Sequence, residues 1–192
     1  MKRMPVVLDL ETKHTFREYN DHKMLGISVF GLYDYATDKS QIFTEDEIQQ
    51  VFPILEKASL LIGFNINGFD MPVLQAYYPG KVSQFHTFDI LDDIKDKLQH
   101  RIPLNELVFT TLGKKKSGHG LMAIDYYKEK KFDELKRYCL DDVMLTKELF
   151  DFGVREGCVY YRQDVKKTAI PVTWKQYLES DGNANTALTL PF

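Results

Sequence analysis

Residues 4–12 read MPVVLDLET, an apolar run that ends in two acids separated by one residue. The apolar part predicts a short buried strand over residues 4–10. Because side chains alternate along a strand, Asp9 and Glu11 point to the same face, with Cβ atoms roughly 6–7 Å apart. Two anions on a buried face are costly unless cations compensate them, and hard ions such as Mg²⁺ or Mn²⁺ prefer carboxylate oxygens. An edge strand whose two acids face solvent remains the alternative on this stretch alone.

Strands and helices alternate along the rest of the chain. Apolar runs bounded by turn residues predict strands at 25–34, 39–44, 59–63, 85–89 and 158–163. Caps and apolar stripes at helical spacing predict helices that begin after Thr44 and at Asp70, and helices over 90–98, 103–112, 121–128 and 133–152. This order indicates an α/β fold with one mixed sheet flanked by helices. We expect one domain over residues 1–163 and a C-terminal extension over residues 164–192, an arm or a partly disordered tail.

Composition limits the possible functions. The 25 basic and 28 acidic residues give a net charge of −3, which argues against a broad basic face that holds nucleic acid. A nuclease stays compatible with this charge, because divalent cations would offset acids gathered in one site. No apolar run approaches the length of a membrane span, and the N-terminal residues do not form a signal peptide, so we expect no membrane association. The two cysteines, Cys139 and Cys158, indicate a reducing compartment, and we expect the cytoplasm.

The predicted helix over residues 133–152 carries an acid within its apolar stripe. Positions 135, 138, 142, 145 and 149 share one helical face, and Asp142 is the acid among them. Tyr138 lies one turn earlier, so its phenol neighbours that carboxylate. Asp142 is therefore predicted to be buried with a partner or beside a polar cavity, with a core tyrosine above an ordinary ion-paired aspartate as the alternative. Asp141 is off the stripe and is predicted to be solvated.

A polar loop precedes another acid. GFNINGFDMPVL at residues 63–74 places Asp70 at the start of a helix, where a carboxylate can be functional or can cap the helix. Phe69 could approach a ligand or belong to the core. Asp89, at the end of a predicted strand, has two similar interpretations: a second carboxylate near the site, or a helix cap.

The three segments together resemble the exonuclease motifs of the DEDD superfamily in its tyrosine branch. VVLDLET carries Asp-x-Glu, GFNINGFDMPVL carries Asn-x-x-x-Phe-Asp, and YCLDDVMLTKELF carries Tyr-x-x-x-Asp. The motif sequences are similar to those of the proofreading exonuclease domain of family B DNA polymerases and of stand-alone YprB-like ribonuclease H-like proteins. The histidine branch has His five residues before the last Asp, and Arg137 stands there in this chain. The resemblance covers about residues 4–152 and implies a ribonuclease H-like fold with 3′-5′ exonuclease activity.

The resemblance also implies a role for each motif residue. Two divalent ions, Mg²⁺ or Mn²⁺, would share the acids: Asp9 would bridge both, Glu11 and Asp142 would complete the ion that activates water, and Asp70 would hold the second ion, partly through water. Tyr138 would orient the water. The implied substrate is the 3′ end of a single strand of nucleic acid, with DNA favoured over RNA, and the implied products are nucleoside 5′-monophosphates.

Three residues are candidates for binding the substrate. Asn65 and Phe69 match family positions that approach the terminal nucleotide, where an aromatic ring can stack on any base. Lys116, with Lys114 and Lys115, could follow the phosphate backbone, although such a charge run is commonly a solvated loop.

Two further questions stay open at this level. Tyr160, Tyr161 and Trp174 could form a stacking platform or an aromatic strand that covers the core. The competing hypothesis for the whole chain is a non-catalytic nucleic-acid-binding or assembly module that keeps the exonuclease fold. A helicase or polymerase partner is not indicated or excluded by the sequence.

Overall fold

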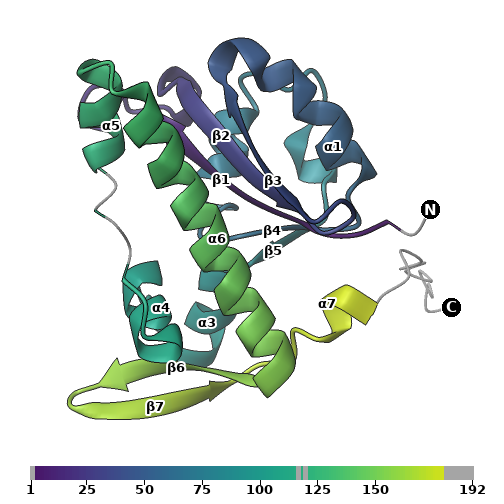
Figure 1. The fold of residues 1–192 in the computed structure, drawn as a ribbon, viewed down its shortest axis with the longest axis vertical. Coiled ribbons are helices and arrows are strands. Elements are labelled where there is room, and N and C mark those ends of the chain that lie inside the picture. Colours follow the sequence, from purple (N-terminus) through teal and green to yellow (C-terminus); the bar gives the residue numbers. More distant parts are fainter. Residues whose placement is uncertain (1–2, 116–117, 119–120, 180–192) are drawn as a thin grey trace, which may run out of the picture.

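The computed structural model describes residues 3–115, 118 and 121–179. Its strands are β1 (Val6–Thr12), β2 (Ile27–Asp34), β3 (Lys39–Thr44), β4 (Leu61–Gly63), β5 (Thr87–Asp89), β6 (Cys158–Gln163) and β7 (Lys166–Pro171). The first five form one sheet in the order β3-β2-β1-β4-β5, and β6 pairs with β7 in a separate hairpin (Figure 1). β1 is antiparallel to β2 and parallel to β4, β3 is antiparallel to β2, and β5 is parallel to β4. The predicted mixed α/β sheet is confirmed.

Helices cover both faces of this sheet. They are α1 (Phe52–Lys57), α2 (Asp70–Leu74), α3 (Ile90–Leu98), α4 (Leu104–Leu112), α5 (Leu121–Lys128), α6 (Phe132–Glu156) and α7 (Gln176–Glu179), with 3₁₀ helices over His22–Met24, Glu45–Gln50 and Val82–Gln84. Leu8 and Leu10 of β1 join the core that contains α1 and α2, whereas Val7 joins the core that contains α3, α4 and α6. Alternation along β1 therefore sends Asp9 and Glu11 to the face that α6 crosses (Figure 1).

Among the described residues, no helix is both long enough and apolar enough to cross a lipid bilayer.

α6 approaches the sheet closely at Gly31 of β2. A Cβ atom at this position would lie 2.9 Å from the Sγ atom of Cys139 and 3.0 Å from the Cγ2 atom of Val143, so the packing leaves no room for a side chain. Gly31 is the register partner of Asp9 on β1. The missing side chain therefore lets the middle of α6 pack directly beside Asp9.

Two helices differ from the prediction in helix type or by more than one residue at an end. The helix predicted after Thr44 begins as the 3₁₀ helix Glu45–Gln50, although its capping box is present, with Glu47 Oε2 accepting a hydrogen bond from the amide of Thr44 at 3.0 Å. α6 continues beyond Phe152 to Glu156, and Gly157 ends it by adopting a φ of 67°. Glycine reaches this left-handed conformation without the penalty that a side chain imposes.

The C-terminal segment differs from the expected arm. β7 pairs along β6, so the predicted boundary after Gln163 falls at the turn of a hairpin. Trp174 is 1% exposed, and its ring stacks on Phe150 of α6 with centroids 5.8 Å apart and an interplanar angle of 9°. Gly153 of α6 makes this possible, because a side chain there would collide with the Trp174 ring. The chain is thus part of the fold as far as α7, and residues 180–192 lie outside the described part.

Candidate metal centre

Three carboxylates converge where β1 meets α6. Asp9 and Glu11 are half-buried on β1, and Asp142 of α6 is 1% exposed. One carboxylate oxygen from each of the three lies within 4.8 Å of the others. Strand alternation placed the first two acids on one face, and the helical stripe placed Asp142 on the inward side of its helix. The structure brings these two faces together, while Asp141 is exposed.

The donor set fits a hard divalent cation. Mg²⁺ takes oxygen ligands at about 2.0–2.1 Å, so ligands on opposite sides of one ion are about 4.2 Å apart. Oxygens that already lie within 4.8 Å of one another need only small movements to share an ion. The Sγ atom of Cys139 lies 3.9 Å from Oδ2 of Asp9, and burial together with the surrounding acids raises the pKa of this thiol. A thiol kept neutral is a poor ligand, so the site favours oxygen-seeking ions.

Asp70 is fixed beside the same strand. It is 3% exposed at the start of α2, and its Oδ1 atom accepts a hydrogen bond from the main-chain amide of Leu10 at 3.0 Å. β4 pairs with β1 only as far as Val7, so the amide of Leu10 is left for this carboxylate. Burial, and then the negative charge of Asp89, raise the pKa of Asp70 to about 7. Asp70 is not one of the three acids whose oxygens cluster, but it is anchored to the strand that carries two of them.

Asp89 ties the loop before Asp70 to the end of β5. Its Oδ1 atom accepts hydrogen bonds from the amides of Asn65 at 2.7 Å and Leu91 at 3.0 Å, and its Oδ2 atom accepts one from the amide of Asn67 at 2.9 Å. Asp89 is 4% exposed, and burial raises its pKa. Asn65 has a left-handed φ of 66°, which non-glycine residues seldom adopt. Asp89 therefore both caps α3 and holds the loop in this strained conformation.

Tyr138 completes the inward face of α6 next to Asp142. It is 2% exposed, and its ring centroid lies 6.4 Å from that of Tyr126 on α5. Gly118 also comes close, because a Cβ atom there would lie 3.2 Å from Cε2 of Tyr138. α5 and Gly118 thus pack against the Tyr138 ring on the helical face that carries Asp142.

Of the two polar residues predicted to bind the substrate, Asn65 is described by the structure and Lys116 is not. Asn65 is half-buried in the loop before Asp70, and its Oδ1 atom accepts a hydrogen bond from Nη2 of Arg101 at 2.9 Å. Lys116 lies outside the described residues. Lys114, two residues earlier in the sequence, forms an ion pair with Glu148 at 2.6 Å.

Phe69 belongs partly to the core and partly to a surface group of rings. It packs against the core on the α1 and α2 side, and its ring centroid lies 5.9 Å from Phe16 and 6.1 Å from His22. Phe16 is 45% exposed. Phe16 and His22 could not be predicted as members of this group, because the segment between β1 and β2 has no periodic pattern of apolar residues.

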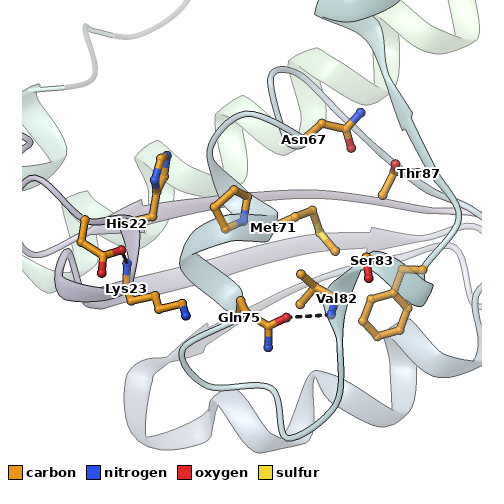
Figure 2. Close-up of a pocket in the computed structure, with 11 residues that line it drawn as sticks. His22, Lys23, Asn67, Met71, Gln75, Val82, Ser83 and Thr87 are labelled. Carbon is orange, nitrogen blue, oxygen red and sulfur yellow. Dashed lines mark hydrogen bonds between the residues drawn. The ribbon is translucent and has the colours of Figure 1, made fainter.

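A pocket of about 380 Å³ opens beside α2. Figure 2 shows His22 and Lys23 on one side, Val82, Ser83 and Thr87 on the other, and Met71 and Gln75 between them. Gln75 Oε1 accepts a hydrogen bond from the amide of Val82 at 3.0 Å, which fixes one wall. None of the four acids lines this pocket, so it is separate from the carboxylate cluster.

Comparisons with known proteins agree with this geometry. A family model described as 3′-5′ exonuclease matches residues 1–152. No curated protein sequence matches the chain. Among solved structures, RNase D of Trypanosoma brucei is similar with a TM-score of 0.56 and 14% sequence identity, over 78% of this chain and 57% of that chain. This likeness shows a shared fold, and the chain spans little more than half the length of that structure.

Proposed function

The chain belongs to the 3′-5′ exonuclease family of the ribonuclease H-like superfamily, and we propose that it degrades single-stranded nucleic acid from the 3′ end with two divalent cations. The proposed substrate is DNA in preference to RNA, and the proposed products are nucleoside 5′-monophosphates. The observation that carries this proposal is the convergence of Asp9, Glu11 and Asp142, with oxygens within 4.8 Å of one another.

The proposed ligands are the four acids of the motifs. Two Mg²⁺ or Mn²⁺ ions held by Asp9, Glu11, Asp70 and Asp142 would stabilise the attacking and leaving oxygens at phosphorus and would make hydroxide available near neutral pH. β1 and α6 are regular elements with buried neighbours, so they hold three of these side chains with little freedom. Asp70 owes its position to the amide of Leu10 and to the loop that Asp89 holds.

Tyr138 is proposed to orient the attacking water. Its phenol is buried on the same helical face as Asp142, one turn away, and in this proposal its hydroxyl would hydrogen-bond a water held beside that carboxylate. A hydrogen bond from a fixed group favours the one water position from which in-line attack is possible. Asn65 and Phe69 are proposed to contact the terminal nucleotide, since both belong to the loop that leads to Asp70.

The preference for DNA rests on the likeness of the motifs to proofreading exonuclease domains. The structurally similar protein is an RNase by name, so RNA is the competing substrate. The cytoplasm is the proposed location, and the two cysteines of the described chain are free, as a reducing compartment would require.

A panel of 5′-labelled DNA and RNA, single- and double-stranded, tests the proposal. We expect Mn²⁺ or Mg²⁺ to support a ladder that shortens from the 3′ end, fastest on single-stranded DNA, and EDTA to stop it. An oligonucleotide with a phosphorothioate at its last linkage is the matched control and should resist. Binding without digestion across the panel would favour the non-catalytic module, and faster digestion of RNA would overturn the DNA preference.

A further inference from the structure

The β6-β7 hairpin lies beyond the residues that the exonuclease family model matches, which end at residue 152. Figure 1 shows it at the C-terminal end of α6, as an extension of the sheet-and-helix body. One face of the hairpin is core, with Val159, Tyr161 and Ile170 buried. Of the three aromatic residues weighed as a stacking platform, Tyr161 and Trp174 are therefore core residues. Tyr160 faces the other way.

The outward face of the hairpin places two cations close to this tyrosine, with the carboxylate of Glu106 accepting a hydrogen bond from the amide of Arg162 at 3.2 Å. The ammonium of Lys167 lies 4.1 Å from the centre of the Tyr160 ring. Arg162 and Lys167 are exposed register partners, directly opposite each other on the two strands. Like charges in this position destabilise a hairpin. Neither cation forms an ion pair with any residue that the structure describes.

The same alternation of cation and ring continues onto α6. Phe152 lies 6.3 Å from Tyr160 between ring centroids, and the guanidinium carbon of Arg155 lies 5.2 Å from the centre of the Phe152 ring. Arg155 also pairs with Glu156 at 2.6 Å. We call Phe152, Arg155, Tyr160, Arg162 and Lys167 the hairpin strip.

α4, on which β6 rests, repeats the pattern. The hydroxyl of Thr111 accepts a hydrogen bond from the amide of Tyr160 at 2.9 Å and donates one to its carbonyl at 3.1 Å, so the edge of β6 is fixed to this helix. Phe109 of α4 is 40% exposed, and the ammonium of Lys115 lies 5.6 Å from its ring centre. The rings of Tyr160 on β6 and Phe109 on α4, each with a lysine ammonium over it, therefore lie on two elements that are hydrogen-bonded to each other.

We propose that the hairpin strip binds the strand of nucleic acid upstream of the 3′ end that enters the carboxylate site. This inference rests on the proposed function, because it assumes a single-stranded polyanion as substrate. Proteins hold such strands through cations that neutralise phosphates and aromatic rings that stack on bases. A phosphate between Arg162 and Lys167 would turn their unfavourable placement into a favourable one. The net charge of −3 argues against a broad basic face, but it allows a local strip of this kind.

The distance along α6 sets a length requirement. Phe152 lies ten residues after Asp142 on one continuous helix, which is about 15 Å at 1.5 Å per residue. A stacked strand advances about 3.4 Å per nucleotide, so about four nucleotides separate the carboxylates from the near end of the strip. A trinucleotide can occupy the carboxylate site but cannot reach the hairpin strip, whereas a 20-mer can occupy both.

Fluorescence anisotropy in EDTA tests this, with 5′-fluorescein oligodeoxythymidylates of 3 and 20 nucleotides as probes. For the double variant R162Q/K167Q we expect weaker binding of the 20-mer, with the slope of log affinity against log salt reduced by about 1.4, since each phosphate contact on a single strand contributes about 0.7. For Tyr160→Ala we expect about tenfold weaker binding of the 20-mer, and for Tyr160→Phe near wild-type binding, because stacking needs the ring and not the hydroxyl. Binding of the 3-mer should not change.

The matched control is K39Q/K57Q, which removes two exposed lysines from β3 and α1. If this control weakens the 20-mer as much as R162Q/K167Q does, or if the hairpin variants bind the 20-mer like wild type, the inference is overturned. Unchanged thermal unfolding of the variants shows that they are folded. Loss of 20-mer binding in the hairpin variants, in a protein that digests no oligonucleotide, would contradict the proposed function and support the hairpin strip. Normal digestion with unchanged 20-mer binding in the hairpin variants would support the proposed function and contradict the role of the hairpin strip.

Discussion

The carboxylate of Asp70 accepts a hydrogen bond from the main-chain amide of Leu10 at 3.0 Å, across sixty residues of sequence. Leu10 lies between Asp9 and Glu11 on β1, so this bond joins the helix of one motif to the strand of another. It also shows how the acids are brought together: by main-chain groups and packed elements, before any cation is considered.

The metal-free protein should be more stable without one of its clustered acids. Asp142→Asn keeps the size of the side chain and removes one of three negative charges that lie close together. We expect the free energy of unfolding in EDTA to rise by on the order of 1 kcal/mol, because mutual repulsion is relieved. In saturating Mn²⁺ the order should reverse, since wild type gains more from the bound ions. Denaturant unfolding under both conditions measures this, and a variant that is less stable in EDTA would contradict it.

Stability of the metal-free protein should depend on pH through Asp70. Its pKa is raised from 3.8 to about 7, so the folded protein binds this proton more tightly than the unfolded chain does. The stabilisation from this proton is complete below about pH 4 and is lost as the pH rises towards 7. Asp70→Asn keeps an oxygen that can accept from Leu10 and has no such proton. The difference in unfolding free energy between wild type and the variant should therefore change between pH 4 and 7, and parallel pH profiles would show that Asp70 does not titrate in this range.

Tyr138→Phe should slow digestion and leave metal binding intact. The ring stays packed against Tyr126, and only the hydroxyl that is proposed to orient the water is lost. We expect kcat to fall by about 10- to 100-fold, the usual cost of removing a group that orients a participant in a metal site. Single-turnover digestion and a Mn²⁺ titration separate the two effects. An unchanged rate would exclude the water-orienting role.

Asp89 should matter to the metal site beyond its role as a helix cap. Asn and Ser both cap helices well, so Asp89→Asn and Asp89→Ser should keep the cap on α3. The Asn side chain of the first variant offers no second oxygen to the main-chain amide of Asn67. The Ser side chain of the second variant is too short to reach the loop amides. We expect the Mn²⁺ concentration for half-maximal activity to rise by about 10- to 100-fold in both variants. An unchanged metal dependence with lower stability would leave Asp89 a structural residue only.

Local signals were enough for much of the fold. The strand at Lys39–Thr44 and the helix at Ile90–Leu98 have the bounds that their turn residues and apolar periods predicted. β7 and α7 could not be predicted in this way. Their place depends on Trp174, which is buried only because Phe150 and Gly153 of a distant helix form a surface for it.

In the site, too, some residues could be predicted from local sequence patterns and others could not. Asp9, Glu11 and Asp142 were placed by strand and helix periodicity, which are local properties. Asp89 could not be assigned from the sequence, because its partners are main-chain amides of a loop and leave no trace in residue type. The close packing at Gly31 could not be predicted either, because glycine occurs in strands for several different structural reasons.

The central claim is that Asp9, Glu11 and Asp142 hold divalent cations for hydrolysis, and calorimetric titration with Mn²⁺ tests it most directly. Wild type, Asp142→Asn and the adjacent exposed control Asp141→Asn should be compared, with digestion of a 5′-labelled single strand measured on the same samples. We predict that Asp141→Asn binds Mn²⁺ and digests like wild type, while Asp142→Asn binds far more weakly and digests more than about 100-fold more slowly. Wild-type binding and digestion by Asp142→Asn would contradict the account.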